Sequence, residues 1–368
     1  SDVYKRQIET ERTSLIYQVA DNGRLYQKYL GKKLNHDSDI QYLPQGTEAY
    51  LTHGMEDYFE PAIHIRHNDN NSSLLLKYVD HSSNAIGNGV NETVITLKDD
   101  KYPVTVKLHY VAYGKENIIR AFSEISHEEK KPVILCKYAS SMLHLNSSKY
   151  FLTEFSGDWA HEANVTEREL AFGKKVIDTK LGARANMFVS PFFQLALDNP
   201  SQENAGEVLV GTIGWTGNFR FTFEVDNKNE LRIISGINPY DSEYSLPAKE
   251  VFRTPDFYFT YSTQGKGEAS RNFHDWARNH QVKNGNDTRM TLLNNWESTY
   301  FDFDENKLIG LMDEATKLGV DMFLLDDGWF ANKYPRSSDH QGLGDWEETA
   351  DKLPNGVGRL VEEAQKKG

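Results

Sequence analysis

Cysteine, positive charge and long apolar runs are scarce in this sequence, and each scarcity excludes a class of protein. The 368 residues include one cysteine, Cys136, so no disulfide can form within the chain. No apolar run reaches the roughly 18 residues that a membrane-spanning helix needs. Lysine and arginine number 41 against 54 aspartates and glutamates, and the net charge of -13 disfavours nucleic acid and anionic membranes as partners.

Motifs for metals and phosphates are also missing. No Cys/His cluster has the spacing of a zinc site, and no glycine-rich loop suits a nucleotide phosphate. We therefore expect no metal and no organic cofactor. Cys136 ends the apolar run 133–136, so a buried, inert thiol is expected in preference to a nucleophile.

The first two-thirds of the sequence show the pattern of β-strands. In Val104–Tyr110 and in Phe219–Val225 every second residue is apolar, which is the period of a half-buried strand. Turn signals such as Asn88-Gly89 separate such runs. Because no helical pattern interrupts them, we predict a large antiparallel β-sandwich over residues 10–284 that ends in a linking helix, Glu268–Gln281.

Strand and helix patterns alternate over residues 285–368. Apolar strands are predicted at Met290–Leu293 and Val320–Leu325, with a helix between them that Asp304 caps and Gly319 ends. A polar loop and a second helix follow. This order is typical of the first two βα units of a (β/α)8 barrel. Because eight units close such a barrel, we expect the sequence to be truncated.

The first residues fit no strand pattern. There is no initiator Met, and residues 2–7 (DVYKRQ) match the translation of a transposase adapter from sequencing libraries. We interpret residues 1–7 as a cloning or assembly scar, with a disordered native tail as the alternative, and treat residues 1–9 as a non-native or disordered leader. The absence of a signal peptide here is therefore uninformative.

Two adjacent carboxylates, Asp326 and Asp327, follow the second predicted barrel strand. Neighbouring strand residues point to opposite faces, so both can reach one ligand only where the strand bends, and Gly328 allows that bend. Carboxylates accept strong hydrogen bonds from sugar hydroxyls, and barrel active sites lie at the C-terminal strand ends. The alternative is a solvated acidic turn in which one Asp caps a backbone group.

Tryptophans accompany both strand ends. Trp296 and Trp329 offer flat faces for a sugar ring, although a buried core role is the alternative. Glu297, beside Trp296, fits either a catalytic or an orienting role. The two working carboxyls of a retaining glycosidase stand about 5–5.5 Å apart across the scissile bond. Neighbours on one strand seldom meet that requirement, so Asp326 and Asp327 are predicted to bind substrate and not to catalyse.

These motifs resemble the bacterial α-galactosidases of glycoside hydrolase family 36. The resemblance rests on Asn294–Phe303 (NNWESTYFDF), Leu325–Phe330 (LDDGWF) and Leu343–Trp346 (LGDW), and it extends upstream through residues 54–62 (GMEDYFEPA) to cover residues 12–368. It implies an N-terminal β-supersandwich on a (β/α)8 barrel. It also implies retaining hydrolysis of terminal α-galactosides of the melibiose and raffinose type, without a cofactor.

The resemblance also implies roles for single residues. Asp326 and Asp327 would hold the galactose hydroxyls around C4 and C6, and Trp296 would line the same subsite. Trp159 matches a sandwich-domain tryptophan that approaches the substrate, commonly from a neighbouring subunit of a tetramer. The family's nucleophile and acid/base lie on later barrel strands, so no catalytic residue is expected within this chain. The chain alone is therefore expected to be inactive.

Further expectations follow from the family. The partners would be α-galactoside oligosaccharides and, in a tetramer or dimer, further copies of the parent; the location would be the cytoplasm. The sequence departs from the family pattern in two places. The segment Asn35–Glu48 is shorter than usual, which leaves the outer-subsite contacts and the oligomeric state open, and residues 331–341 form a less acidic loop, which leaves the preference for longer substrates open. The alternatives are action on α-N-acetylgalactosaminides, galactosyl transfer, or a non-catalytic carbohydrate-binding sandwich module.

Overall fold

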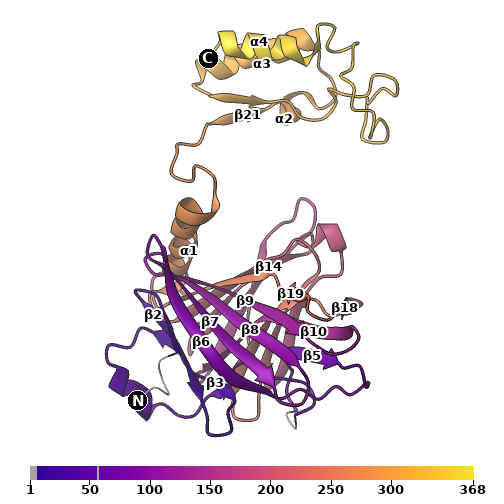
Figure 1. Ribbon diagram of the computed structural model, residues 1–368. Coiled ribbons are helices and arrows are strands. Elements are labelled where there is room, and N and C mark those ends of the chain that lie inside the picture. The colour runs from indigo at the N-terminus through magenta and orange to yellow at the C-terminus, as the bar shows by residue number, and fades with distance from the viewer. Residues whose placement is uncertain (1–5, 56–57) are drawn as a thin grey trace. The chain divides into compact units, whose positions relative to one another are not determined.

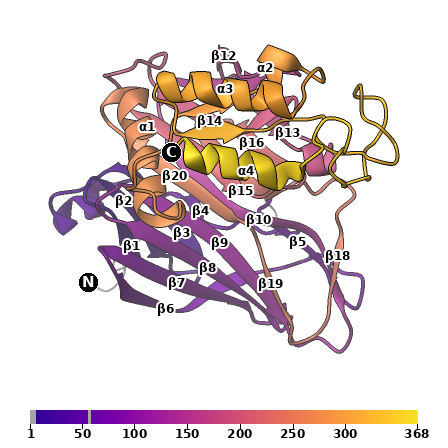
Figure 2. The same ribbon diagram turned by 90° about the horizontal axis from the view of Figure 1, so that it is seen from above.

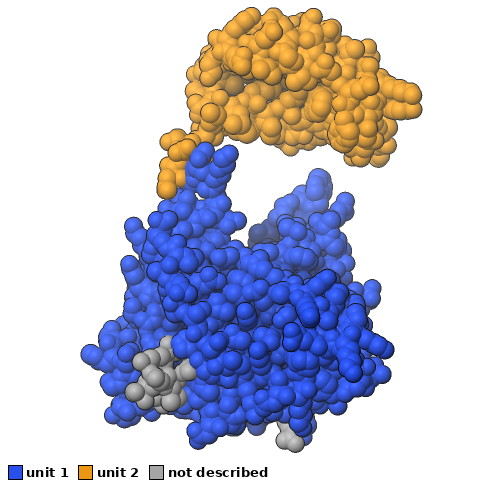
Figure 3. All heavy atoms as spheres, viewed as in Figure 1, with its two compact units in different colours: residues 1–285 blue, residues 286–368 orange. Residues whose placement is uncertain are grey.

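The computed structural model describes residues 6–55 and 58–368, and the chain divides into two compact units (Figure 3). Unit 1 is Ser1–Gly285 and unit 2 is Asn286–Gly368, a division one residue after the boundary drawn from the sequence. Ser1–Lys5 of the expected leader lie outside the described residues. So do Glu56 and Asp57 of the stretch 54–62.

The largest sheet of unit 1 has ten antiparallel strands. Nine of them follow the order β12-β11-β14-β15-β20-β9-β8-β7-β6, and β19 pairs with β9 (Figure 1). The strands are β6 (Leu76–Gly87), β7 (Val90–Asp99), β8 (Val104–Tyr113), β9 (Ile118–His127), β11 (Tyr150–Ser156), β12 (Asn164–Glu169), β14 (Val189–Leu197), β15 (Val208–Gly214), β19 (Val251–Arg253) and β20 (Asp256–Ser262). At the predicted β6–β7 turn, Asn88 and Gly89 have φ of 56° and 73°, as a type I′ hairpin requires.

A six-stranded and a four-stranded sheet complete unit 1. The six-stranded sheet has the order β13-β16-β17-β10-β18, with β5 also paired to β10, and the four-stranded sheet has the order β1-β2-β3-β4. Their strands are β1 (Arg6–Glu9), β2 (Thr13–Val19), β3 (Leu25–Lys32), β4 (Thr47–Glu48), β5 (Ile63–Arg66), β10 (Val133–Asn146), β13 (Gly173–Asp178), β16 (Phe219–Val225), β17 (Glu230–Ile237) and β18 (Tyr244–Leu246). The short 3-10 helices η2 (Asp37–Tyr42) and η3 (Gly182–Arg184) lie in the connections.

Strand β1 corrects the expectation of a disordered leader. Its four residues pair antiparallel with β2, and Ile8 is 2% exposed within the sandwich core. Residues 6–9 therefore belong to the fold. The sequence pattern did not show this because so short a strand owes its place to its pairing partner.

Phenylalanine rings from both large sheets fill the core of unit 1. The ring of Phe193 on β14 lies 5.1 Å from that of Phe221 and 4.9 Å from that of Phe223, both on β16. A Cβ at Gly211 on β15 would stand 2.7 Å from the rings of Phe193 and Phe257. Close packing between the rings thus requires glycine at position 211.

The linking helix begins earlier than predicted. Helix α1 runs over Gly265–Trp276, and a π-helical turn, η4 (Ala277–Gln281), continues it to the expected end. In its first turn the amides of Lys266 and Gly267 donate to the carbonyls of Gln202 and Glu203 at 2.9 Å each. These two carbonyls satisfy donors that a helix start otherwise leaves unpaired, so the helix starts there and not at Glu268.

Unit 2 has two parallel strands with helices packed on one face. Strands β21 (Leu292–Asn294) and β22 (Met322–Leu324) pair in register, and α3 and α4 lie side by side (Figure 2). The helices are α2 (Trp296–Thr299), α3 (Glu305–Lys317) and α4 (Gly356–Lys366). The second strand was expected to be buried, but alternate side chains such as Met322 and Leu324 are exposed, because only one face of this sheet carries helices.

The start of α3 provides a test of this local structure. Asp304 accepts a hydrogen bond from the Lys307 amide at 2.9 Å, as predicted for a helix cap. Asp304→Ala is expected to destabilise α3 by about 1 kcal/mol, measured by hydrogen exchange of the α3 amides. Asp302→Ala is the control, since the Asp302 side chain is 99% exposed. Equal effects of the two substitutions would contradict the capping role.

Candidate functional site

Two hydrogen bonds connect the residues that follow β21 and β22. The Asp326 amide donates to Asn295 Oδ1 at 2.7 Å, and Asn294 Nδ2 donates to Asp326 Oδ2 at 2.7 Å. Asn295 is fully buried. The two asparagines therefore fix where Asp326 stands, a role that the sequence did not assign to them.

The carboxylate of Asp326 remains able to accept more hydrogen bonds. Its Oδ2 accepts from Asn294, and its Oδ1 accepts from the Asp327 amide at 2.7 Å. Each carboxylate oxygen has two lone-pair sites, so each keeps one beyond these contacts. Asp326 is half-buried, and it is thus positioned by the fold while still able to receive donors from a ligand.

Asp327 is held by an arginine that the sequence interpretation did not select. Arg336 Nε and Nη2 donate to the two oxygens of Asp327 at 2.5 and 2.6 Å, and Arg336 Nη1 donates to the Gln341 carbonyl at 2.6 Å. The Arg336 side chain is 5% exposed. Its bidentate hydrogen bonds hold the pKa of Asp327 below the usual range, so this carboxyl stays ionised.

Trp296 stands at the same strand ends as the first residue of α2. Its amide donates to Asn294 Oδ1 at 2.8 Å, and its ring meets the ring of Phe301 edge-on with centroids 4.9 Å apart. The Arg336 guanidinium lies 5.6 Å from the centre of the Phe301 ring. Trp296, Asp326 and Asp327 are therefore linked through shared neighbours within one small region.

Lys352, in the loop before α4, forms hydrogen bonds to this region. Its ammonium donates to the carbonyls of Phe301 at 2.8 Å and Gly328 at 3.0 Å, and burial lowers the pKa of this lysine. Gly328 has φ of +98°, so the predicted bend after the aspartates is present. A Cβ there would approach the Phe301 ring to 3.1 Å. No sequence motif signals the role of Lys352.

Trp329, Trp346 and Glu297, whose roles the sequence left open, have different surroundings. Trp329 packs against the core between the strands and the helices, which fits the core interpretation. Trp346 is 63% exposed, and its ring lies 4.7 Å from that of Phe330. Glu297 is exposed, and it accepts a hydrogen bond from the Tyr300 hydroxyl at 3.1 Å. Glu297 is thereby oriented towards Tyr300.

Trp159 belongs to unit 1, in the loop between β11 and β12, and its side chain is 84% exposed. It thus belongs to a different unit from the strand-end residues Trp296, Asp326 and Asp327. Cys136 is half-buried rather than buried, and its partial burial raises the pKa of the thiol. The protonated thiol is a poor nucleophile.

In residues 6–55 and 58–368, no three His, Cys, Asp or Glu side chains come together as ligands for a metal ion. Over the same described part of the chain, none of the helices combines the length and the apolar character needed to cross a bilayer.

Two family models match the chain, and together they span both units. The N-terminal domain of glycosyl hydrolase family 36 matches residues 23–247, and melibiase matches residues 251–368. The chain belongs to glycoside hydrolase family 36. The predicted β-sandwich followed by the start of the catalytic domain is confirmed.

Family 36 relatives with known names are longer than this chain. An α-galactosidase of Lactobacillus acidophilus is 27% identical over 398 residues, covering 98% of this chain and 54% of that protein. The α-galactosidase AgaA of Geobacillus stearothermophilus is 32% identical over 300 residues, covering 81% and 40%. The chain thus spans about half the length of the curated relatives it matches.

Solved structures of the family match nearly all of the chain. A variant of Geobacillus AgaA in complex with raffinose gives a TM-score of 0.90 at 27% identity, covering 98% of this chain and 55% of that one. The α-galactosidase from Lactobacillus brevis gives 0.88 at 26% identity, covering 98% and 53%.

The pairing of Arg336 with Asp327 predicts how this family 36 site responds to pH. The pair stabilises the folded chain above the unfolded carboxyl pKa of about 3.9, and this contribution is lost as the pH falls through the lower folded pKa. Arg336→Gln is expected to raise the pKa of Asp327 towards about 3.9, measured from its carboxyl ¹³C shift. Arg359→Gln, which removes a surface arginine paired with Glu363, is the control and should leave the Asp327 pKa unchanged. No change in Arg336→Gln would contradict the role of the pair.

Proposed function

We propose that the protein to which this chain belongs is an α-galactosidase that hydrolyses terminal α-galactosides of the melibiose and raffinose type with net retention. The observation that supports this most directly is the placement of two carboxylates, Asp326 and Asp327, with Trp296 at the ends of adjacent parallel strands. Family membership, relatives named as α-galactosidases, and structures of Geobacillus AgaA variants with raffinose and with stachyose also support it.

In this proposal the residues of the chain bind and orient the sugar. Asp326 and Asp327 accept hydrogen bonds from the hydroxyls around C4 and C6, and charge-assisted bonds of this kind are stronger than neutral ones. Trp296 lies against the C–H face of the ring. Because Arg336 and the asparagines already fix both carboxylates, little rearrangement is needed on binding.

Bond cleavage is assigned to other groups. A retaining glycosidase needs a nucleophile and an acid/base on opposite sides of the scissile bond. Asp326 and Asp327 are sequence neighbours, and Asp327 is neutralised by Arg336, so they suit binding better than attack. We place the two catalytic carboxyls on later barrel strands, outside these 368 residues, and accordingly expect this chain alone to be inactive.

Assembly and location complete the proposal. We propose a homo-oligomer, either a tetramer or a dimer, in which Trp159 contributes to a neighbouring subunit's substrate site. The exposure of Trp159, Val165 and Phe172 in and around β12 supports an interface there. We propose the cytoplasm as the location, in keeping with a single, unpaired cysteine.

Galactose binding by the 368-residue chain tests the proposed binding residues. Galactose is expected to shift the indole N–H resonance of Trp296 with a dissociation constant in roughly the millimolar range. Glucose, which differs at C4, should shift it less. Asp326→Ala is expected to weaken galactose binding about tenfold, because a charge-assisted hydrogen bond contributes about 1.5–3 kcal/mol. Exposed Asp302→Ala is the matched control. Equal affinities for wild type and Asp326→Ala would remove Asp326 from the site.

A further inference from the structure

Tyr300, the residue that follows α2, has an unusual backbone conformation. Its φ is +48° and its ψ is -130°, and a residue with a bulky side chain rarely adopts a positive φ. Such a conformation costs free energy, and it persists only where the surrounding contacts hold it. The residue contacts Trp296, so this strain lies beside the proposed sugar-binding residues.

Hydrogen bonds on both sides of Tyr300 hold it in this conformation. Its amide donates to the Trp296 carbonyl at 2.7 Å, and its carbonyl accepts from the Thr299 hydroxyl at 3.1 Å. Asn295 Nδ2 donates to the same Thr299 hydroxyl at 2.9 Å. Because Asn295 also accepts from the Asp326 amide, one buried asparagine connects the backbone of Tyr300 to Asp326.

The turn at Tyr300 places two consecutive aromatic rings against Trp296. The rings of Tyr300 and Phe301 meet the Trp296 ring edge-on, at interplanar angles of 88° and 90° and centroid distances of 5.3 and 4.9 Å. Neighbouring side chains of an extended strand point to opposite faces, so an ordinary strand would not bring both rings to one partner. Edge-on contacts between aromatic rings are attractive and depend on the angle between the rings. The two rings together therefore restrain how the Trp296 ring turns.

The two rings differ in their surroundings. Phe301 is half-buried, and its carbonyl accepts a hydrogen bond from Lys352. Tyr300 is 54% exposed, and its hydroxyl donates to Glu297 at 3.1 Å, which raises the pKa of this tyrosine. A ring so exposed adds little to core packing, whereas glycine would adopt a positive φ without strain. Core packing thus does not explain why a tyrosine stands at position 300.

We propose that Tyr300 is a positioning residue of the sugar site, which fixes the plane of the Trp296 ring against which the sugar lies. This rests on the proposed function, in which Trp296 contacts the C–H face of galactose. A Trp296 side chain that is already held loses less freedom when the sugar binds, and this favours affinity. Because Asn295 connects Tyr300 to Asp326, the ring and the carboxylate also keep a constant separation.

The test replaces Tyr300 in the 368-residue chain and follows the indole N–H of Trp296. Trp296→Phe identifies that signal among the six tryptophans by its loss. Tyr300→Gly removes the ring while glycine tolerates the positive φ, so the midpoint of thermal unfolding is expected to be retained. The ¹⁵N order parameter of the Trp296 indole is expected to fall. The dissociation constant for galactose is expected to rise about fivefold, equivalent to about 1 kcal/mol.

Two further variants test whether the ring itself is responsible. Tyr300→Phe keeps the ring and loses only the hydroxyl, so the indole order and the galactose affinity are expected to stay within about twofold of wild type. Tyr334→Ala removes another exposed tyrosine ring of unit 2, one that lies beside Lys333, and should change neither quantity.

The outcomes distinguish the role of Tyr300 from the proposed function. The role is overturned if Tyr300→Gly leaves the indole order parameter at the wild-type value, or if it lowers the order without weakening galactose binding. An equal loss of order in Tyr334→Ala would mean a general loosening of unit 2 and would also contradict it. If the wild-type chain does not respond to galactose, the proposed sugar site fails, while the order parameter still decides whether Tyr300 holds Trp296.

Discussion

The link between Asn295 and the Asp326 amide is the contact on which the strand-end site depends. It joins the end of β21 to the end of β22, and Asn294 reinforces it by donating to the Asp326 carboxylate. A fully buried amide with a fixed partner has almost no rotational freedom, so the distance between the two strand ends is set. This one connection therefore fixes the positions of Trp296, Asp326 and Asp327.

A second layer of cations stabilises the region around those strand ends. Arg336 reaches Asp327 from the long loop after β22, and Lys352 reaches two backbone carbonyls from the far end of the same loop. Both charged groups lie beside aromatic rings, with the Lys352 ammonium 4.6 Å from the centre of the Phe303 ring. A loop without regular secondary structure is thus held at two points by charge-assisted hydrogen bonds.

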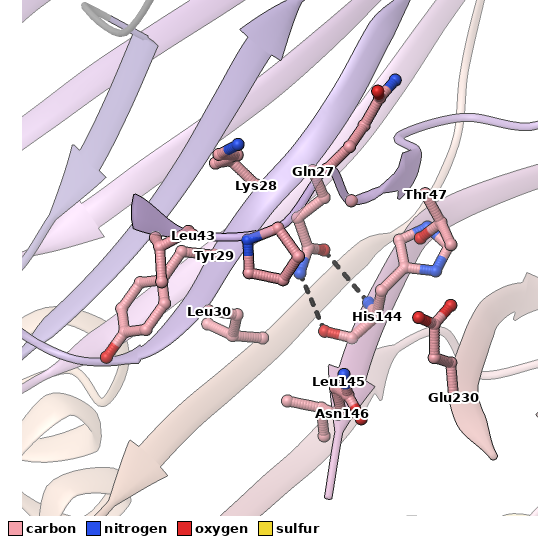
Figure 4. Close-up of a pocket in the computed structure, with 13 residues that line it drawn as sticks. Gln27, Lys28, Tyr29, Leu30, Leu43, Thr47, His144, Leu145, Asn146 and Glu230 are labelled. Carbon is pink, nitrogen blue, oxygen red and sulfur yellow. Dashed lines mark hydrogen bonds between the residues drawn. The ribbon is translucent and has the colours of Figure 1, made fainter. Parts of the chain in front are cut away.

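The features predicted correctly from the sequence are those that a few neighbouring residues determine. Features that depend on residues far away in the sequence were not predicted. The Asp304 cap and the Gly328 bend follow from a few neighbouring residues, and both are present. The strand at residues 6–9 depends on pairing with β2, and Arg336 depends on how a loop folds back. The hydrogen bonds between Gln27 and His144, drawn in Figure 4, join residues 117 positions apart in the sequence, a pairing that no linear motif encodes.

Asp326 and Asp327 can only accept hydrogen bonds when ionised, and Arg336 balances one of their two charges. If the two carboxylates bind the sugar as proposed, Asp326 is the one of the pair that faces that sugar without an ion-pair partner among the described residues. A hexose oxidised at C6 to a uronic acid would bring its own carboxylate towards Asp326 and meet repulsion, whereas the neutral hexose offers donors. The proposed site would thus disfavour acidic sugars by charge alone.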